Sequence, residues 1–346
     1  MSTWTDWTSC SLTSGQCQKT RSRTCNQGCD NVTNEDLEQT QSCDDDGYSG
    51  DGVTCSENFA VWLAYDRDNW VTNGYVDNGH LNQDGSWTDI RGSVVQVEVG
   101  EFGTFGINSG NVLYYKFGTH EDPYSAGPIT GTSNCGNNCR TEWQRLDEDV
   151  EYVSSGLNTA FILKGNGQAG NYNLYSMENV SLDAYGNLQY DLLQLDGGLI
   201  NVSLHRGIAW GVGYTWAHGL TMFRGDASLA RQPGQGYHWT RIEDENSITQ
   251  IEIGEFGVFG TTDSGEIYYR VGTHRNIDSI GTGWQRVPGI LTHITSGINR
   301  VYGVNSSKQL YKMKSDVTFN EQGEMTWQEL PWELLAERSG SNVSVL

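Results

Sequence analysis

The stretch that decides the fold is Val97-Glu-Val-Gly-Glu-Phe-Gly-Thr-Phe-Gly106, because it reappears 154 residues later as Ile251-Glu-Ile-Gly-Glu-Phe-Gly-Val-Phe-Gly260. The two copies stay in step through Tyr114-Tyr-Lys-Phe-Gly-Thr-His120 and Tyr268-Tyr-Arg-Val-Gly-Thr-His274. Short alternating runs of this kind, broken by glycine turns, are typical of antiparallel β-strands. An internal repeat of this length predicts an architecture that stacks copies of one supersecondary unit.

A finer repeat lies inside the large one. The pattern W-x-x-[ILV] begins at five tryptophans, and a degenerate sixth copy lies between Tyr190 and Leu195; the five are Trp87, Trp143, Trp239, Trp284 and Trp327. The 290 residues after position 56 therefore divide into six units of about 48 residues, the size of a four-stranded propeller blade. We expect these tryptophans to pack between neighbouring sheets. The sequence predicts an all-β fold with a six-bladed β-propeller over residues 57–346.

The two ends of this repeat predict how the ring closes. Asn201-Val-Ser-Leu begins the third blade, whereas its counterpart Asn342-Val-Ser-Val is followed by the end of the chain at Leu346. The strands that should follow Asn342 are found instead after Phe59. We therefore expect the C-terminal residues to form the innermost strand of a blade whose other strands are N-terminal. Such closure removes exposed sheet edges.

Residues 1–56 form a separate module with six of the eight cysteines and few large aliphatic residues, so that it needs disulfides to be stable. The order Trp4-x-x-Trp-x-x-Cys10, then Cys17, then Arg21-Ser-Arg-Thr-Cys25 resembles a thrombospondin type 1 repeat, in which tryptophans stack on arginines. This resemblance implies mannosylation of Trp4 and the disulfides Cys10–Cys43, Cys17–Cys55 and Cys25–Cys29. The stretch Gly47–Cys55 also looks like the end of an EGF-like module, which leaves a hybrid pairing open.

The propeller resembles a second family. Ile267-Tyr-Tyr-Arg-Val-Gly with Gly283-Trp-Gln-Arg-Val-Pro-Gly, and Val301-Tyr-Gly-Val-Asn-Ser with Leu310-Tyr-Lys-Met, are similar to tectonin repeats. That family includes fish-egg lectin and tachylectin-like proteins, which are six-bladed and bind sugars. The resemblance covers roughly residues 57–346. It implies the fold more firmly than the ligand, since function depends on sites rather than on folds.

Candidate ligand-binding residues recur in the first and fourth blades. Glu101 and Glu255 begin the loop between strands one and two, and His120 and His274 begin the loop between strands three and four. These loops emerge on one face of a four-stranded meander, where carboxylate and imidazole could bind sugar hydroxyls and Arg275 could add donors. In the alternative interpretation, the glutamates cap turns and the histidines bond to loop carbonyls.

The opposite face offers Tyr214, Trp216 and His218 in a glycine-rich turn, with Asp66-Arg-Asp at the matching place in another blade. An exposed tryptophan beside polar groups is a platform on which a pyranose ring can stack, although Trp216 could simply cover its blade. Cys135 and Cys139 are expected to form a disulfide that rigidifies a long loop of the first blade.

Composition limits the classes of partner. A net charge of −22 disfavours nucleic acid, and no apolar run is long enough to span a bilayer. The cysteine framework and five N-glycosylation triplets favour secretion, with the leader already removed; the triplets begin at Asn31, Asn179, Asn201, Asn305 and Asn342. No G-x-S-x-G, H-E-x-x-H or P-loop is present, so no enzymatic activity is expected. No cofactor is expected, and calcium stays open because of the 43 carboxylates.

Two hypotheses for function follow. The first is a secreted lectin that recognises glycans through the rim loops of the propeller, with affinity multiplied by repetition. The second is a structural matrix or adhesive protein whose propeller and N-terminal module bind other extracellular proteins or further copies of the chain. Competition by free sugar would distinguish the first hypothesis, and calcium-dependent polymerisation the second.

Overall fold

The computed structural model divides the chain into two units, Met1–Phe59 and Ala60–Leu346. The structure describes residues 11–13, 16–22, 38–42, 61–64, 77–81, 87–92, 94–100, 102–120, 143–156, 159–165, 171–215, 217–226, 239–242, 246–297, 300–340 and 342–345. All regular elements in these ranges are strands. None of the described segments contains a helix that is long and apolar enough to cross a membrane.

The N-terminal unit contains one antiparallel sheet in the order β1-β2-β3, formed by Ser11–Thr13, Gln16–Ser22 and Glu38–Ser42. β2 is the central strand and pairs with both neighbours. The side chain of Cys17 and the predicted modification and disulfide sites of this unit, together with Cys135 and Cys139, lie outside the described residues; these sites are Trp4, Cys10, Cys25, Cys29, Asn31, Cys43 and Cys55.

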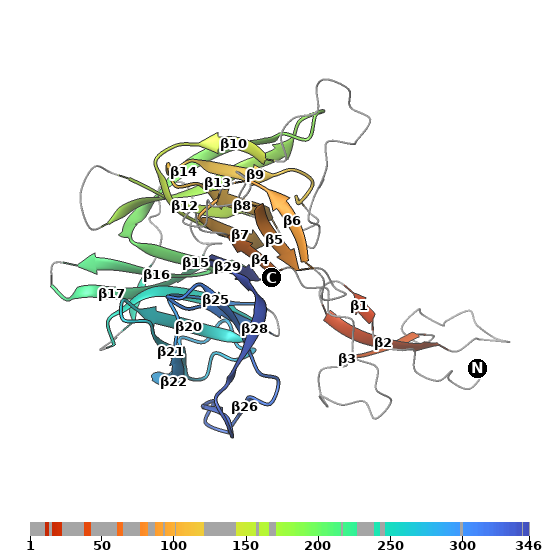
Figure 1. Ribbon diagram of the computed structural model, residues 1–346, viewed down its shortest axis with the longest axis vertical. Coiled ribbons are helices and arrows are strands. Elements are labelled where there is room, and N and C mark those ends of the chain that lie inside the picture. Colours follow the sequence, from red (N-terminus) through yellow and green to blue (C-terminus); the bar gives the residue numbers. More distant parts are fainter. Residues whose placement is uncertain are drawn as a thin grey trace, which may run out of the picture. The chain divides into compact units, whose positions relative to one another are not determined.

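The second unit is an all-β propeller (Figure 1). Its described strands form six four-stranded antiparallel sheets, written here from the inner to the outer strand. The sheets are β7 (Gln96–Gly100)-β8 (Gly103–Ile107)-β9 (Leu113–Lys116)-β10 (Trp143–Asp147); β11 (Val150–Ser155)-β12 (Ala160–Lys164)-β13 (Tyr172–Leu182)-β14 (Leu188–Leu199); β15 (Asn201–His205)-β16 (Ile208–Thr215)-β17 (Gly219–Asp226)-β18 (Thr240–Ile242); β19 (Ile248–Gly254)-β20 (Gly257–Thr262)-β21 (Glu266–Arg270)-β22 (Trp284–Ile290); β23 (His293–Ser296)-β24 (Val301–Val304)-β25 (Gln309–Met313)-β28 (Trp332–Ser339); and β29 (Asn342–Val345)-β4 (Val61–Ala64)-β5 (Asp77–Leu81)-β6 (Trp87–Arg91).

The first strands of these sheets surround a common centre. β7 contacts β11, and the contacts continue from β11 to β15, β19, β23 and β29, which returns to β7. The inner strands are almost wholly buried because their apolar residues pack against the neighbouring sheets, as in β7 and β29. Figure 1 shows β7, β15 and β29 near the middle of the propeller and the outer strands β10 and β22 at its margins.

The C-terminal strand β29 pairs antiparallel with β4, so that Asn342 faces Ala64 and Val345 faces Val61. Residues from the two ends of the propeller sequence therefore lie side by side in one sheet. The C-terminus is drawn next to β4 in Figure 1. This pairing gives the inner edge of β4 a hydrogen-bonded partner instead of leaving it open.

The Asn-Val-Ser segments join neighbouring sheets. Asn342 Oδ1 accepts the backbone N–H of Val97 at 2.9 Å, and Ser344 Oγ accepts that of Val99 at 2.9 Å. The other copy makes the same two bonds: Asn201 accepts from Ile251 at 2.8 Å and Ser203 from Ile253 at 3.0 Å. Side-chain oxygens of one inner strand thus accept hydrogen bonds from backbone N–H groups of the next inner strand, as a neighbouring strand would do within a sheet.

The other four interfaces use the same principle with different residues. Ser154 Oγ accepts the N–H of Leu204 at 2.9 Å, and Thr295 Oγ1 accepts that of Val345 at 3.3 Å. The side-chain amides of two glutamines donate to backbone carbonyls of the following inner strand, Gln96 to Val153 at 3.2 Å and Gln250 to Ile294 at 2.8 Å. Each of the six contacts between inner strands therefore includes a side chain bonded to backbone.

The tryptophans of the finer repeat occupy the outer parts of these interfaces. Trp143 is 8% exposed and meets Trp62 edge-on at 6.2 Å, and Trp239 Nε1 donates to Asp196 O at 3.0 Å in the preceding sheet. Trp327 packs against the core between two strands of this region, just before the outer strand of its sheet. The β26–β27 hairpin, Thr318–Phe319 and Met325–Thr326, is inserted there, and the outer strand begins at Trp332.

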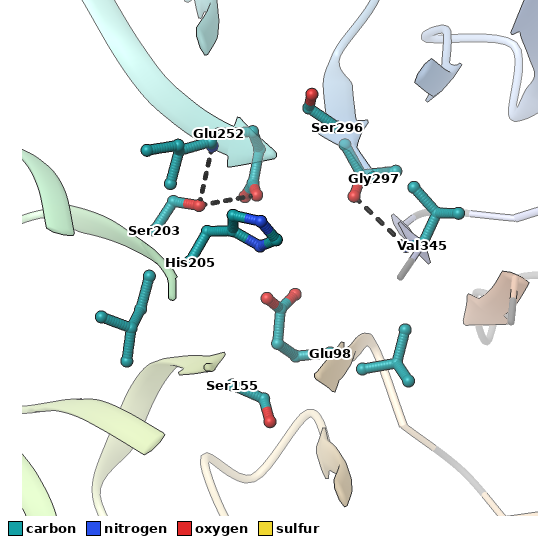
Figure 2. Close-up of a pocket in the computed structure, with 12 residues that line it drawn as sticks. Glu98, Ser155, Ser203, His205, Glu252, Ser296, Gly297 and Val345 are labelled. Atoms are coloured by element: carbon teal, nitrogen blue, oxygen red, sulfur yellow. Dashed lines mark hydrogen bonds between the residues drawn. The ribbon is translucent and has the colours of Figure 1, made fainter. Parts of the chain in front are cut away.

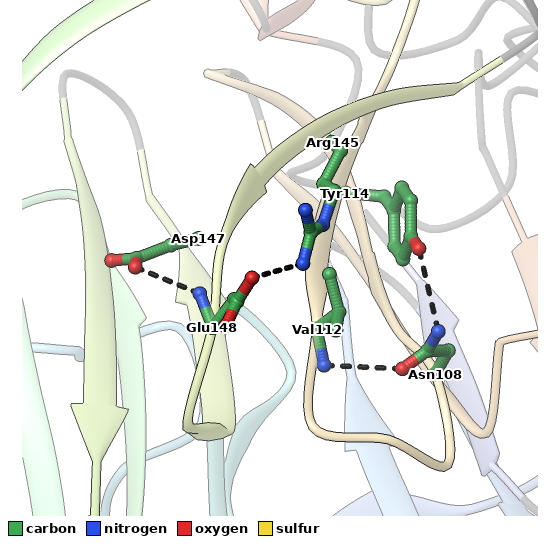
Figure 3. A network of polar contacts seen from close by, with 6 residues as sticks. All are labelled: Asn108, Val112, Tyr114, Arg145, Asp147 and Glu148. Atoms are coloured by element: carbon green, nitrogen blue, oxygen red, sulfur yellow. Dashed lines mark hydrogen bonds and ion pairs between the residues drawn. The ribbon is translucent and has the colours of Figure 1, made fainter.

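Hairpin turns on one rim are closed by side chains as well. Figure 3 shows Asn108 Oδ1 accepting the N–H of Val112 at 3.1 Å, while Asn108 Nδ2 donates to the hydroxyl of Tyr114 at 3.4 Å. On the adjoining turn, Arg145 pairs with Glu148. Asparagine is favoured in such turns because its short side chain bonds to backbone a few residues on.

The burial of Asn201 and Asn342 corrects the interpretation of their triplets as glycosylation sites. Their side chains are 4% and 6% exposed, and their amide oxygens are bonded to the next sheet, which leaves no room for a glycan in the folded ring. Asn179 is exposed on the long β13–β14 hairpin. Asn305 is half-buried and accepts the N–H of Gln309 at 2.9 Å within its turn.

Replacement of Asn342 by alanine should lower the free energy of unfolding by roughly 2 kcal/mol, because the buried N–H of Val97 loses its acceptor. The matched variant Asn201→Ala should cost a similar amount through Ile251. Urea denaturation measures both, with Asn305→Ala in an exposed turn as the control. A loss at Asn342 no greater than at Asn305 would contradict the structural role of this amide.

Folded protein from a eukaryotic secretory host should carry an N-linked glycan at Asn179 and none at Asn201 or Asn342, since only the first is exposed. Peptide mass spectrometry before and after enzymatic deglycosylation measures the occupancy of each triplet. A glycan on Asn342 in the monodisperse folded fraction would be incompatible with the β29–β7 contact.

Candidate functional site

The recurring histidines on the first rim are part of its scaffold. His120 Nδ1 lies 2.9 Å from Phe102 O, and His274 Nδ1 lies 2.9 Å from Phe256 O. Their backbone N–H groups donate to the hydroxyls of the tyrosines that precede them by five residues, each at 3.1 Å. The two copies therefore use the histidine in the same way, to tie the loop after strand three to the loop after strand one.

The His274 ring is also packed between aromatic groups. It stacks on Phe319 at a centroid distance of 3.7 Å and meets Phe256 edge-on at 5.1 Å. Burial lowers the pKa of His274, which favours the neutral imidazole. Since Phe256 O can only accept, Nδ1 carries the proton. These contacts favour the turn-stabilising interpretation of this histidine over a direct role in sugar binding.

Glu255 is held by the neighbouring blade. Its carboxylate pairs with Arg206, in the turn after β15, and lies 3.6 Å from Nε2 of His205, the last residue of β15. The contact with His205 and the charge of Arg206 lower the pKa of Glu255, although burial opposes them. The Arg275 N–H donates to Glu255 O at 2.8 Å, and its side chain is exposed. Of the predicted residues on this rim, Glu101 lies outside the described residues.

A polar cavity lies at the centre of the ring and opens toward this first rim. It measures about 20 Å³, which holds water or one small ion but not a sugar. Figure 2 shows the carboxyl groups of Glu98 and Glu252 entering it from different strands, with His205 between them in this view. Its remaining lining comes from inner strands and includes three serines, Ser155, Ser203 and Ser296.

Both glutamates are fully buried and hydrogen-bonded. Ser203 Oγ donates to Glu252 at 3.0 Å and Tyr152 OH donates at 2.9 Å. Ser344 Oγ donates to Glu98 at 3.2 Å. Burial raises the pKa of Glu252 to about 7 and raises the pKa of Glu98 well above its usual value, to which the charge of Glu252 adds.

The opposite rim exposes an aromatic side chain, that of Tyr214. Tyr214, at the end of β16, is 50% exposed, and its backbone is fixed by two bonds to the Asn171 side chain of the preceding blade, at 2.9 and 3.0 Å. His218, just before β17, is exposed and lies 2.8 Å from Arg241 Nη1. The structure thus brings Tyr214 and His218 to one edge, whereas Trp216 and residues 66–68 lie outside the described residues.

The His218–Arg241 contact fixes the proton on the imidazole. Arginine only donates, so His218 Nε2 accepts, and Nδ1 carries the hydrogen. The edge therefore offers the aromatic ring of Tyr214 and, on the face of the sheet that carries Phe223 and Arg241, an imidazole N–H donor and further guanidinium donors. Sugar recognition uses this set, because the C–H face of a pyranose packs on an aromatic ring while its hydroxyls pair with polar groups.

The sequence could have indicated several residues that the predictions missed. Glu98 and Glu252 are single carboxylates in the apolar runs Val97–Val99 and Ile251–Ile253, which signals a buried charge. Arg241 and Asn171 carry no comparable signal, because only the fold brings Arg241 to His218 and Asn171 to Tyr214. The described residues contain no cluster of three histidine, cysteine, aspartate or glutamate side chains that could hold a metal.

Two parts of the chain match known protein families. Residues 137–340 match the Tectonin domain family, and residues 2–47 match the Thrombospondin type 1 domain. Among curated proteins, none matches the sequence. Similar solved structures include human WBSCR16 (TM-score 0.40, 10% identity, 75% of this chain and 88% of that chain), TolB from Acinetobacter baumannii (0.48, 8%, 83% and 66%) and YCF48 bound to D1 peptide (0.39, 10%, 81% and 78%).

The matched Tectonin segment covers more than half of the chain. It begins shortly before β10, the outer strand of the first sheet, and ends directly after β28. The internal repeat and the sheet architecture are consistent with this match. The chain belongs to the tectonin family.

Proposed function

We propose that the protein is a secreted, non-enzymatic carbohydrate-binding protein whose propeller binds glycans at its rim. Membership of the tectonin family supports a lectin-type function. The observation that carries the proposal is the β16–β17 turn, where Tyr214 is exposed and its backbone is held by Asn171, and where His218 pairs with Arg241. The thrombospondin-type unit supports an extracellular setting.

The closed circle of inner-strand contacts supports a complete ring of six blades, and we propose this count for the propeller. Such a ring holds its rim loops on a rigid frame, which is the usual way in which propellers and other β-scaffolds present binding residues. Sites on different blades would raise the apparent affinity for a glycan-coated surface without new contacts at any one site.

Glycan-array screening should identify sugars whose binding is competed by the free sugar. For the best of these, Tyr214→Ala and His218→Ala should each weaken binding about tenfold or more, because stacking and hydrogen-bond contacts of this kind are worth roughly 1–2 kcal/mol. Titration calorimetry measures the effect. The matched control is Tyr185→Ala, which removes a tyrosine that is 84% exposed on another blade. Equal losses at Tyr185 and Tyr214 would contradict the assigned edge.

A second candidate function rests on a different surface. The β13–β14 hairpin, with strands of 11 and 12 residues, exposes three apolar side chains: Leu182 at 43%, Leu193 at 44% and Tyr185 at 84%. Exposed apolar groups of this kind are typical of protein contacts. This surface supports the alternative of a matrix or assembly protein.

Sedimentation velocity distinguishes the two functions. If the protein assembles, the wild type should sediment as a larger species, with or without calcium, and Tyr185→Ala should shift it toward the monomer while Tyr214→Ala should not. A monomer at all concentrations and in both conditions would rule out self-assembly and leave glycan binding as the function under test.

A further inference from the structure

The cavity at the centre of the ring brings two carboxyl groups together from blades that are three positions apart. Glu98 lies on β7 and Glu252 on β19, the equivalent strands of the two halves of the repeat, and both line the same small space. We infer that Glu98 and Glu252 form a proton-binding site, and that a proton held there at neutral pH stabilises the closed ring.

The groups that contact these carboxyls are neutral. Glu252 is bonded to Ser203 and Tyr152, and Glu98 to Ser344 and, at 3.4 Å, to Ser154. Hydroxyl donors lower the cost of a buried negative charge only in part. Within the described residues, neither glutamate makes an ion pair with lysine, arginine or histidine, so a proton is the available means of neutralising the pair.

The other titratable and charged groups around the cavity do not alter this balance. Tyr152 is half-buried, and desolvation raises the pKa of its hydroxyl well above the usual value, so it stays neutral. Burial lowers the pKa of His293 to about 4, so that this imidazole is also neutral. Among the other described groups, Glu151 is bonded to Asn111 and Arg206 is paired with Glu255, while His205 lines the cavity with its Nε2 3.6 Å from Glu255.

Two like charges in so small a buried space cannot both ionise near neutral pH. Burial raises the pKa of both carboxyls, that of Glu252 to about 7. A carboxyl whose pKa is raised on folding stabilises the folded state when the pH is below its pKa in the unfolded chain. This stabilisation is lost as the pH rises through its pKa in the folded protein. The loss is therefore expected to begin above about pH 5, to pass through pH 7 for Glu252 and to continue at higher pH for Glu98.

The same hydroxyls connect the site to ring closure. Ser344 Oγ donates to Glu98 and accepts the N–H of Val99, which joins β29 to β7. Ser203 Oγ likewise donates to Glu252 and accepts the N–H of Ile253, which joins β15 to β19. Ionisation of either glutamate therefore acts directly on a hydrogen bond between two blades. This effect does not depend on which ligand binds at the rims.

The test compares thermal unfolding from pH 5 to pH 9 for the wild type, Glu98→Gln and Glu252→Gln. Glutamine mimics the protonated carboxyl, so the variants should unfold close to the wild-type temperature at pH 5 and several degrees above it at pH 9. The control Glu329→Gln changes an 82% exposed carboxylate and should follow the wild type throughout. If the glutamine variants also follow the wild type at every pH, the inference is wrong.

Infrared spectroscopy on the wild type gives a second readout that needs no variant to fold. Protein labelled with ¹³C at glutamate side chains should show the carbonyl stretch of a protonated carboxylic acid at pH 7, and the band should weaken as the pH rises from 7 to 9. Its absence at pH 7 in folded protein would overturn the proton-binding site. Where the double variant Glu98→Gln/Glu252→Gln folds, it should lack the band; a persistent band would assign the proton elsewhere.

Discussion

The structure depends on the backbone N–H groups at the free edge of each inner strand. An inner strand has one hydrogen-bonded neighbour in its own sheet, and its other edge faces the next blade at the buried centre, where an unpaired N–H is costly. Side chains of the adjacent inner strand resolve this, with Asn342 and Ser344 accepting from Val97 and Val99, and Asn201 and Ser203 doing so in the other half. These bonds hold neighbouring sheets together as a ring.

This requirement explains why the centre is polar and the rims are left to function. Serine, asparagine and glutamine occupy buried inner positions because they bond to backbone, and the two glutamates are accommodated among them. His274 and Glu255 fix loops on the first rim by contacts within the protein. The glycan recognition that we propose then falls to an edge such as Tyr214, where an exposed side chain lies on a rigid strand.

The alternation and internal repeat predicted the strands, the propeller and the placement of Asn342 beside the residues after Phe59, because these follow from local patterning and repeat arithmetic. The sequence did not distinguish a glycosylation site from a structural asparagine at Asn201 and Asn342. Asn-Val-Ser matches the glycosylation pattern whether it is exposed or buried, and contacts with residues distant in the sequence decide which of the two it is. The β26–β27 hairpin was not predicted, because it lies between the repeated strands and breaks the period of the repeat. The Tyr214 edge could be predicted only in part, since Asn171 and Arg241 reach it through the fold.

Native-state hydrogen exchange tests the central claim most directly. The account predicts that the amides of Val97, Val99, Ile251 and Ile253 exchange only through global unfolding, as slowly as amides within the sheets, because side-chain acceptors on the neighbouring blade protect them. Exchange of these four amides at the rate of exposed rim loops, while the sheet amides stay protected, would show that the inner strands are not joined in this way and would contradict the account.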